Sequence, residues 1–257
     1  MFKNHLSKLF PKGGIKIKAI IPAAGFGTRL AHISNGKPKA LMLIKGKPLL
    51  DYIIEKLDKI DEIDEVFLVS NAKFFPQFFE WKSAVKSRIP ITLLNNGVWQ
   101  NEFRKGRVND IVSPFPKGIL DDIIIVLGDN FFNFELKEIV SFFKARNADV
   151  ITVYDVHSLD EAKKLGVVTI DENNRIVHLA EKPERPRSTL SVAGVYLFTA
   201  KTAEMLRKYA ETAKDDRGPT HFLEDNYTTH PFYAFIVDSD KNQWHDVGSE
   251  DVYNKIK

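Results

Sequence analysis

The chain has 257 residues, of which 44% are hydrophobic and 11% aromatic, enough to build a sizeable folded core. The net charge is only +3, so charge alone gives no reason to expect a nucleic-acid or membrane partner. Cysteine is absent, which excludes disulfides and Cys-ligated metal sites and fits a reducing compartment.

The first 14 residues, MFKNHLSKLFPKGG, are basic but lack the apolar region and cleavage site of a signal peptide. Nor does any apolar run approach the ~20 residues that cross a membrane. We therefore expect a cytoplasmic protein with an N-terminal extension over residues 1–14 and a single domain over residues 15–257. The apolar residues of the extension could mediate association, which leaves a homo-oligomer open.

Strand-like apolar runs and helix-like periodicity alternate through the first half of the chain. Strands are expected at residues 19–21, 65–70, 91–96 and 122–127, and helices at residues 49–60, from Pro76 onward, and as a turn near residue 107. Such alternation predicts an α/β fold in which a doubly wound, mostly parallel, Rossmann-like sheet is covered on both faces, with right-handed crossovers.

The second half begins with a helix at residues 135–147 and a strand at 150–156, and then changes to short strands joined by tight turns. Strands are expected at residues 167–170, within IVHLAEKP from residue 176, and at 191–199, with DENNR (171–175) as a hairpin turn in which Asn can accept a positive φ. A helix at 200–213 and a last strand at 232–237 follow. We interpret this half as a small antiparallel elaboration of the sheet.

The first strand runs into a basic, glycine-rich loop, PAAGFGTRL. Gly25 and Gly27 lack Cβ atoms, so their backbone N–H groups can approach an anion closely. Arg29 and Lys39 follow and add positive charge. The loop lacks the third glycine of the dinucleotide fingerprint and the Gly-Lys-Ser/Thr of a P-loop, which disfavours a dehydrogenase. A phosphate-binding loop is predicted.

Further polar residues follow predicted strands, where ligands bind in open α/β sheets. Asp129 follows the strand at 122–127, and Glu181 and Lys182 follow the strand that starts at residue 176. Asp246 precedes a glycine near the C-terminus. Each short motif is also common in ordinary turns and loops, so their meaning depends on their occurring together.

Together and in order, GFGTRL, KPKAL, GDN, LGVV, EKP, AGVY and WHDVGS resemble the sugar-1-phosphate nucleotidyltransferases over about residues 18–257. Glucose-1-phosphate thymidylyltransferase-like enzymes are the most similar in length and layout. The resemblance implies attack of a sugar 1-phosphate on the α-phosphorus of a nucleoside triphosphate, releasing pyrophosphate. Its implied partners are these two substrates, or another phosphomonoester as acceptor, with Mg²⁺ as cofactor and no nucleic acid or membrane.

The resemblance also implies roles for individual residues. Arg29, Lys39 and Lys182 are implied to be catalytic, Lys182 at the acceptor phosphate, while Asp129 and Asp246 would carry Mg²⁺. The residues implied to bind the nucleotide are Ala24, Gly25, Gly27, Thr28, Asn96, Gly97 and Gly106. Those implied to bind the acceptor are Gly166, Glu181 and Gly194. The seven histidines are interpreted as structural.

The base is left open, because the stretch NNGVWQNEFRKGR (95–107) departs from the thymidylyltransferase pattern. In it, Arg104, Lys105 and Arg107 are interpreted as a solvated basic turn. One alternative function is a cytidylyltransferase for a phosphorylated non-sugar such as phosphocholine, held by Trp99, Phe103, Tyr227 and Tyr233. Another is a catalytically silent regulator that binds nucleotide sugars; it is disfavoured because Arg29 and both metal aspartates are present.

Overall fold

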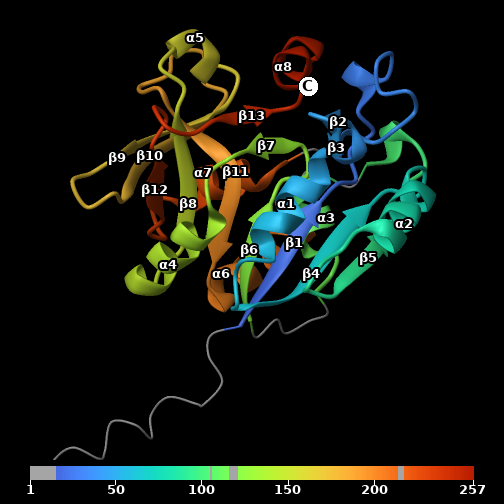
Figure 1. Ribbon diagram of the computed structural model, residues 1–257. Helices are drawn as coiled ribbons and strands as arrows, with labels where there is room; N and C mark the ends of the chain where they lie inside the picture. Colours follow the sequence, from blue (N-terminus) through green and yellow to red (C-terminus); the bar gives the residue numbers. More distant parts are fainter. Residues whose placement is uncertain (1–15, 105, 116–120, 214–216) are drawn as a thin grey trace, which may run out of the picture.

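A nine-stranded mixed sheet runs through the protein (Figure 1). The computed structural model describes residues 16–104, 106–115, 121–213 and 217–257, so the expected N-terminal extension lies outside the described residues. One half of the sheet is parallel, in the order β6–β1–β4–β5. The bounds of these strands are Asp122–Val126 (β6), Ile17–Pro22 (β1), Ile63–Ser70 (β4) and Ile91–Asn95 (β5).

The other half of the sheet is built around β11 (Leu190–Phe198), which pairs antiparallel with β6, β8 and β9. The remaining strands are β8 (Val150–Asp155), β9 (Gly166–Ile170), β10 (Ile176–Glu181) and β12 (Tyr233–Val237). Strands β9 and β10 form a hairpin whose turn contains Asn174 at φ 61°, as the sequence predicts. The expected α/β sheet with an antiparallel elaboration is confirmed.

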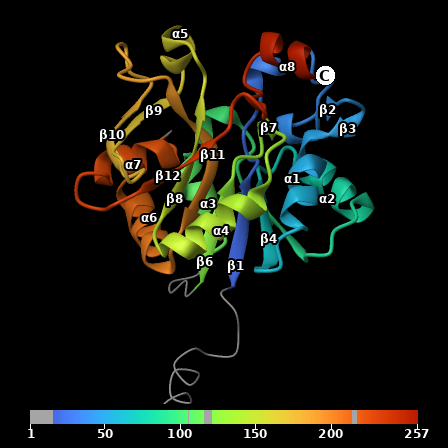
Figure 2. The same ribbon diagram turned by 60° about the vertical axis from the view of Figure 1, so that its left-hand side comes forward.

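Helices cover both faces of the sheet (Figures 1 and 2). Alternating strand residues face opposite ways: Ile21 packs into one apolar cluster and Ile20 into the other. The first cluster includes residues of α1 (Leu49–Leu57), α2 (Phe75–Ala84) and α4 (Leu136–Arg146). The second includes residues of α3 (Arg107–Val112), α6 (Ala200–Thr212) and α7 (Pro219–Asn226).

Several short elements were not foreseen from the sequence. They are β2 (Leu43–Ile44), β3 (Lys47–Pro48), α5 (Leu159–Ala162), α7, α8 (Glu250–Ile256), and a two-stranded sheet of β7 (Asn130–Phe132) and β13 (Trp244–Asp246). The expectation that residues 232–237 form the last strand is therefore wrong. Three-residue strands are too short to show a hydrophobic period, which is why pattern reasoning misses them.

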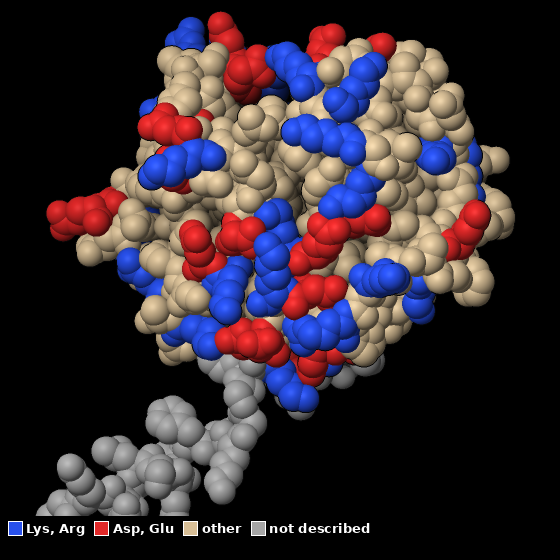
Figure 3. Space-filling model, in the orientation of Figure 1, with Lys and Arg blue, Asp and Glu red and all other residues tan. Residues whose placement is uncertain are grey.

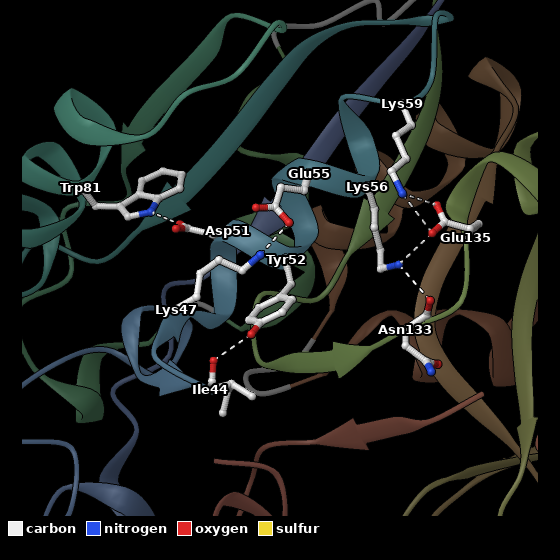
Figure 4. A network of polar contacts seen from close by, with 10 residues as sticks. All are labelled: Ile44, Lys47, Asp51, Tyr52, Glu55, Lys56, Lys59, Trp81, Asn133 and Glu135. Atoms are coloured by element: carbon white, nitrogen blue, oxygen red, sulfur yellow. Dashed lines mark hydrogen bonds and ion pairs between the residues drawn. The ribbon is translucent and has the colours of Figure 1, made fainter. Parts of the chain in front are cut away.

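Polar contacts of α1 connect it to the elements around it (Figure 4). Lys56 Nζ donates to the backbone oxygen of Asn133 at 2.9 Å, and both Lys56 and Lys59 pair with Glu135. Trp81 Nε1 of α2 donates to Asp51 at 2.7 Å. Since residues 133–135 link β7 to α4, these contacts attach the end of β7 to the helical layer.

Acidic and basic side chains are interspersed on the face shown in Figure 3, without a broad region of one sign. That distribution agrees with the near balance of 37 basic and 34 acidic residues. None of the helices within the described residues is both long and apolar enough to cross a membrane.

Candidate active site

The glycine-rich loop lies at the carboxyl end of β1. Gly27 has φ +61°, a left-handed conformation that favours glycine, and it begins a short 3-10 turn at Thr28–Leu30. A Cβ at Gly27 would lie 3.4 Å from Lys39 Cγ. The positive φ is therefore the reason for glycine at this position, and the loop packs against the Lys39 side chain.

The buried side chain of Asn71, just after β4, holds this loop in place. Its Nδ2 donates to the backbone oxygen of Ala24 at 2.9 Å, and its Oδ1 accepts from the Phe74 N–H at 2.9 Å. The loop is thereby tied to the start of α2. Sequence reasoning missed Asn71 because an asparagine after a strand has no motif that distinguishes it from a turn residue.

The pairing of β7 with β13 brings the two predicted metal ligands together. Asp246 lies opposite Asn130 in this antiparallel ladder, and Asn130 follows Asp129 in the chain. The Val247 N–H also donates to the backbone oxygen of Asp129 at 2.9 Å. Two carboxylates that are far apart in the sequence thus become neighbours, as the interpretation of both as ligands of one ion requires.

Buried side chains behind Asp129 fix its position. Trp244 Nε1 donates to Asn130 Oδ1 at 2.7 Å, and Asn130 Nδ2 donates to Asp129 Oδ1 at 3.1 Å. Asn130 is only 2% exposed, and a Cβ at Gly194 would lie 2.5 Å from its Oδ1. Gly194, at φ +68°, therefore provides the space that the Asn130 amide occupies.

The electrostatics of the carboxylate pair favour a cation. The surrounding protein removes part of the water around Asp246, although its side chain still reaches solvent. This partial desolvation and the like charge of Asp129 raise the pKa of Asp246 to about 6. Lys39 Nζ lies 3.4 Å from Asp129 Oδ2 and balances only part of this charge. Two neighbouring carboxylates with one lysine partner form an oxygen-rich site that suits a hard cation.

Glu181 and Lys182 stand where β10 ends. Lys182 has φ +48°, which is uncommon for a side chain that carries a Cβ, and its N–H donates to Leu165 O at 3.0 Å. Its Nζ lies 3.4 Å from Glu181 Oε1, yet 58% of the side chain is exposed. The backbone holds Lys182 in a strained conformation while its ammonium group stays accessible to a ligand.

These elements surround one cleft of about 360 Å³, a volume suited to a small-molecule ligand. The predicted site residues that line it are Ala24, Gly25, Gly27, Thr28, Arg29, Lys39, Gly106, Asp129, Glu181 and Lys182. Asn96, Gly97, Gly166, Gly194 and Asp246 lie outside this lining.

Two of the residues outside the lining support residues that belong to it. Asn96 Nδ2 donates to Asp110 Oδ1 at 2.8 Å, and Asp110 lines the cleft. A Cβ at Gly166 would lie 2.4 Å from Thr220 Cγ2 and 3.1 Å from Glu181 Oε2. Gly166 therefore lets two cleft residues approach β9 closely.

The cleft also contains polar residues that sequence reasoning did not assign to it: Asn101, Arg104, Arg107, Asp110, Tyr196, Thr220 and His221. His221 lines the cleft, and the interpretation of the histidines as structural stays a prediction. Its Nδ1 accepts from the Gly218 N–H at 3.2 Å, so the neutral ring carries its proton on Nε2 and can donate there. The dipeptide Gly218-Pro219 is a recognisable signal for the start of a helix. No feature of the neighbouring sequence, however, indicates that this helix lies at the cleft.

The four aromatic residues considered for a choline-binding box are not in the cleft lining. Trp99 and Phe103 are 67% and 68% exposed. The ring of Tyr227 contacts His178, and Arg146 stacks over Tyr233 at 4.4 Å. Tyr227 and Tyr233 therefore have different neighbours, and Trp99 and Phe103 are largely exposed, so the structure offers no support for a common choline-binding box.

A family model described as nucleotidyl transferase matches residues 18–257. The chain belongs to the nucleotidyl transferase family. This result confirms the resemblance inferred from the motifs, which also begins near residue 18 and extends to the last residue. Members of the family are enzymes, as the sequence predicts.

Individual relatives agree with this assignment. UTP–glucose-1-phosphate uridylyltransferase AglF of Haloferax volcanii is 30% identical over 71% of this chain and 72% of its own length. A bifunctional protein GlmU of Methanocaldococcus jannaschii is 29% identical over 80% of this chain, which spans only 46% of that relative. A solved UDP-glucose pyrophosphorylase bound to UDP-glucose has the same fold, with TM-score 0.76 and 22% identity over 94% of this chain and 97% of its own.

Gly194→Ala should destabilise this nucleotidyl transferase by about 2–4 kcal/mol, because it combines a strained positive φ with a contact against Asn130. Gly46→Ala is the matched control, since Gly46 has φ +80° and nothing within 4 Å of the added Cβ. Urea unfolding measures both variants. Equal losses of stability would show that the contact with Asn130 contributes nothing.

Asn71→Ala should weaken nucleoside triphosphate binding on the order of tenfold and destabilise the fold by about 1–3 kcal/mol, since buried backbone groups of Ala24 and Phe74 lose their partners. Calorimetric titration and urea unfolding give the two quantities. Unchanged nucleotide affinity would mean that the loop keeps its shape without Asn71.

Proposed function

We propose that this nucleotidyl transferase transfers a nucleotidyl group from a nucleoside triphosphate to a sugar 1-phosphate and releases pyrophosphate. The observation that carries the proposal is the convergence of a basic glycine loop, Asp129 and Glu181–Lys182 on one cleft, with Asp246 held beside Asp129 by the pairing of β13 with β7. The names of the Haloferax relative and of the solved pyrophosphorylase support a sugar-phosphate acceptor.

The reaction makes modest chemical demands of the protein. One oxygen of the acceptor phosphate forms a bond to the α-phosphorus, the bond from that phosphorus to the β-bridging oxygen breaks, and pyrophosphate leaves with the electron pair. A phosphate monoester is largely dianionic at neutral pH, so no general base is needed to generate the nucleophile. Positioning and charge neutralisation carry the catalysis.

We assign these tasks to the residues of the cleft. Arg29 and the backbone from Gly25 to Thr28 hold the β- and γ-phosphates, and Lys39 contacts the α-phosphate and the departing pyrophosphate. Lys182 holds the acceptor phosphate, and Glu181 accepts hydrogen bonds from sugar hydroxyls. All of these residues except Phe26 line the cleft, which supports the assignment.

Asp129 and Asp246 fit a Mg²⁺ ion. No group of three or more His, Cys, Asp or Glu side chains in the described part of the chain could hold a metal, so the protein would supply two carboxylates. Mg²⁺ commonly binds one or two carboxylates and takes its other ligands from substrate phosphates and water. When bound, the ion would neutralise phosphate charge during transfer.

The test is a panel of the common nucleoside triphosphates against several sugar 1-phosphates and phosphocholine, with pyrophosphate release as the signal. We expect turnover with a sugar 1-phosphate, and the panel identifies the base. Turnover with phosphocholine alone would support the cytidylyltransferase alternative. Tight binding of nucleotide sugar without pyrophosphate release from any pair would instead support a silent regulator.

Asp129→Asn and Asp246→Asn should each reduce turnover on the order of a thousandfold or more while the protein stays folded, because each removes a metal carboxylate and keeps its shape. Mg²⁺-dependent binding of the nucleoside triphosphate should weaken in parallel. Wild-type turnover in either variant at saturating Mg²⁺ would contradict the metal assignment.

Lys182→Ala and Arg29→Ala should affect different substrates, because their side chains are assigned to different phosphates. Lys182→Ala should bind Mg²⁺-nucleoside triphosphate almost as well as wild type, yet lose turnover by orders of magnitude and bind the acceptor more weakly. Arg29→Ala should mainly lose nucleotide affinity. Calorimetry without acceptor, followed by steady-state kinetics, separates the two. Unchanged acceptor saturation in Lys182→Ala would make this lysine a surface residue.

A further inference from the structure

Arg107 is a cation of the cleft that the roles above leave unused. It is the first residue of α3, after Gly106, and it lines the cleft with its side chain exposed to solvent. Within the described residues, no carboxylate or carbonyl group pairs with its guanidinium group. The nearby Arg217 is different, because its side chain bonds Tyr209 and Asp225.

Packing places Arg107 on the same wall of the cleft as Glu181 and Lys182. The Val108 N–H donates to Arg217 O at 3.3 Å, and a Cβ at Gly218 would lie 3.6 Å from Arg107 Cδ. Helix α7 begins immediately after Gly218, and its residue Thr220 lies against Gly166 beside Glu181. The entry to α7 thus joins Arg107 to the proposed acceptor end of the cleft.

The cations of the cleft come from different segments of the chain. Lys39 follows the glycine loop, and a Cβ at Gly27 would lie 3.4 Å from its Cγ. Arg107 begins α3, and Lys182 follows the end of β10. All three residues line the cleft.

We propose that Arg107 binds the acceptor phosphate together with Lys182, so that two cations hold this group while it attacks the α-phosphorus. This inference rests on the proposed function. A guanidinium group can donate two parallel hydrogen bonds to one phosphate, whereas an ammonium group acts as a point charge. Arg107 would orient the nucleophilic phosphate, and Lys182 would add charge.

The test compares Arg107→Ala and Arg107→Lys with wild type. Arg107→Ala should lose on the order of a hundredfold in kcat/KM for the acceptor, while its affinity for Mg²⁺-nucleoside triphosphate stays near wild type. Arg107→Lys should recover only part of the loss, and added guanidinium ion should partly restore Arg107→Ala. Lys208→Ala, on the exposed surface of α6, is the control for removing one positive charge and should behave as wild type.

A double-mutant cycle with Lys182→Ala decides whether the two cations share one phosphate. If they do, the double variant should lose less activity than the product of the two single losses. Independent losses that multiply, normal acceptor saturation in Arg107→Ala, or an equal loss of nucleotide affinity would each overturn the assignment. Thermal unfolding of every variant confirms that the fold is retained.

Calorimetric binding of the sugar 1-phosphate keeps this inference separate from the proposed function. Arg107→Ala should bind the sugar 1-phosphate more weakly than wild type does, whether or not turnover is measured. If wild type releases pyrophosphate but both proteins bind the acceptor equally, the inference fails and the proposed function stands. If wild type releases none with any substrate pair, the proposed function fails, and the binding comparison still decides whether Arg107 contacts a phosphate monoester.

Discussion

The pairing of β7 with β13 is the interaction on which the site depends. Asn130 and Trp244 are 114 residues apart, and their hydrogen bond at 2.7 Å lies beneath the carboxylate pair. The short ladder places Asp246 beside Asp129, although two like charges repel each other at such a site. Backbone pairing and a buried tryptophan therefore hold together two groups that electrostatics alone would separate.

Close packing around this ladder explains where glycine is needed. Gly194 lacks the Cβ that would collide with the Asn130 amide, and Gly166 lacks the one that would collide with Thr220. Both positions were expected to line the acceptor pocket with backbone, and that role stays a prediction. Their observed surroundings show that each also allows a neighbouring side chain to reach its place in or beneath the cleft wall.

The cleft gathers positive charge from separate parts of the chain. Arg29 and Lys39 come from the segment after β1, Arg107 from α3, and Lys182 from the end of β10. Two anionic substrates must approach one another for the proposed transfer to occur. Cations from several elements can neutralise them from different sides, which one loop could not do.

The sequence by itself determined the order of the main strands and helices and predicted a phosphate-binding role for the glycine loop. Hydrophobic runs and helical periods along residues 19–156 predicted this order, because these signals are local. The glycines and Arg29 indicated anion binding because their chemistry follows from residue type and from their place after a strand. The ordered motifs then indicated the family.

Only the tertiary structure decided which side chains meet. The register of β7 against β13, the contact of Asn71 with Ala24 and the position of Arg107 beside the entry to α7 all join residues distant in sequence. Arg107 looked like part of a solvated basic turn because Arg104 and Lys105 lie just before it in the sequence. Its place in the cleft depends on where the chain returns more than a hundred residues later, at Arg217 and Gly218. The hydrophobic pattern around Arg107 cannot predict that residues 217 and 218 will lie beside it. Their position is set by the packing of the whole sheet and its helices.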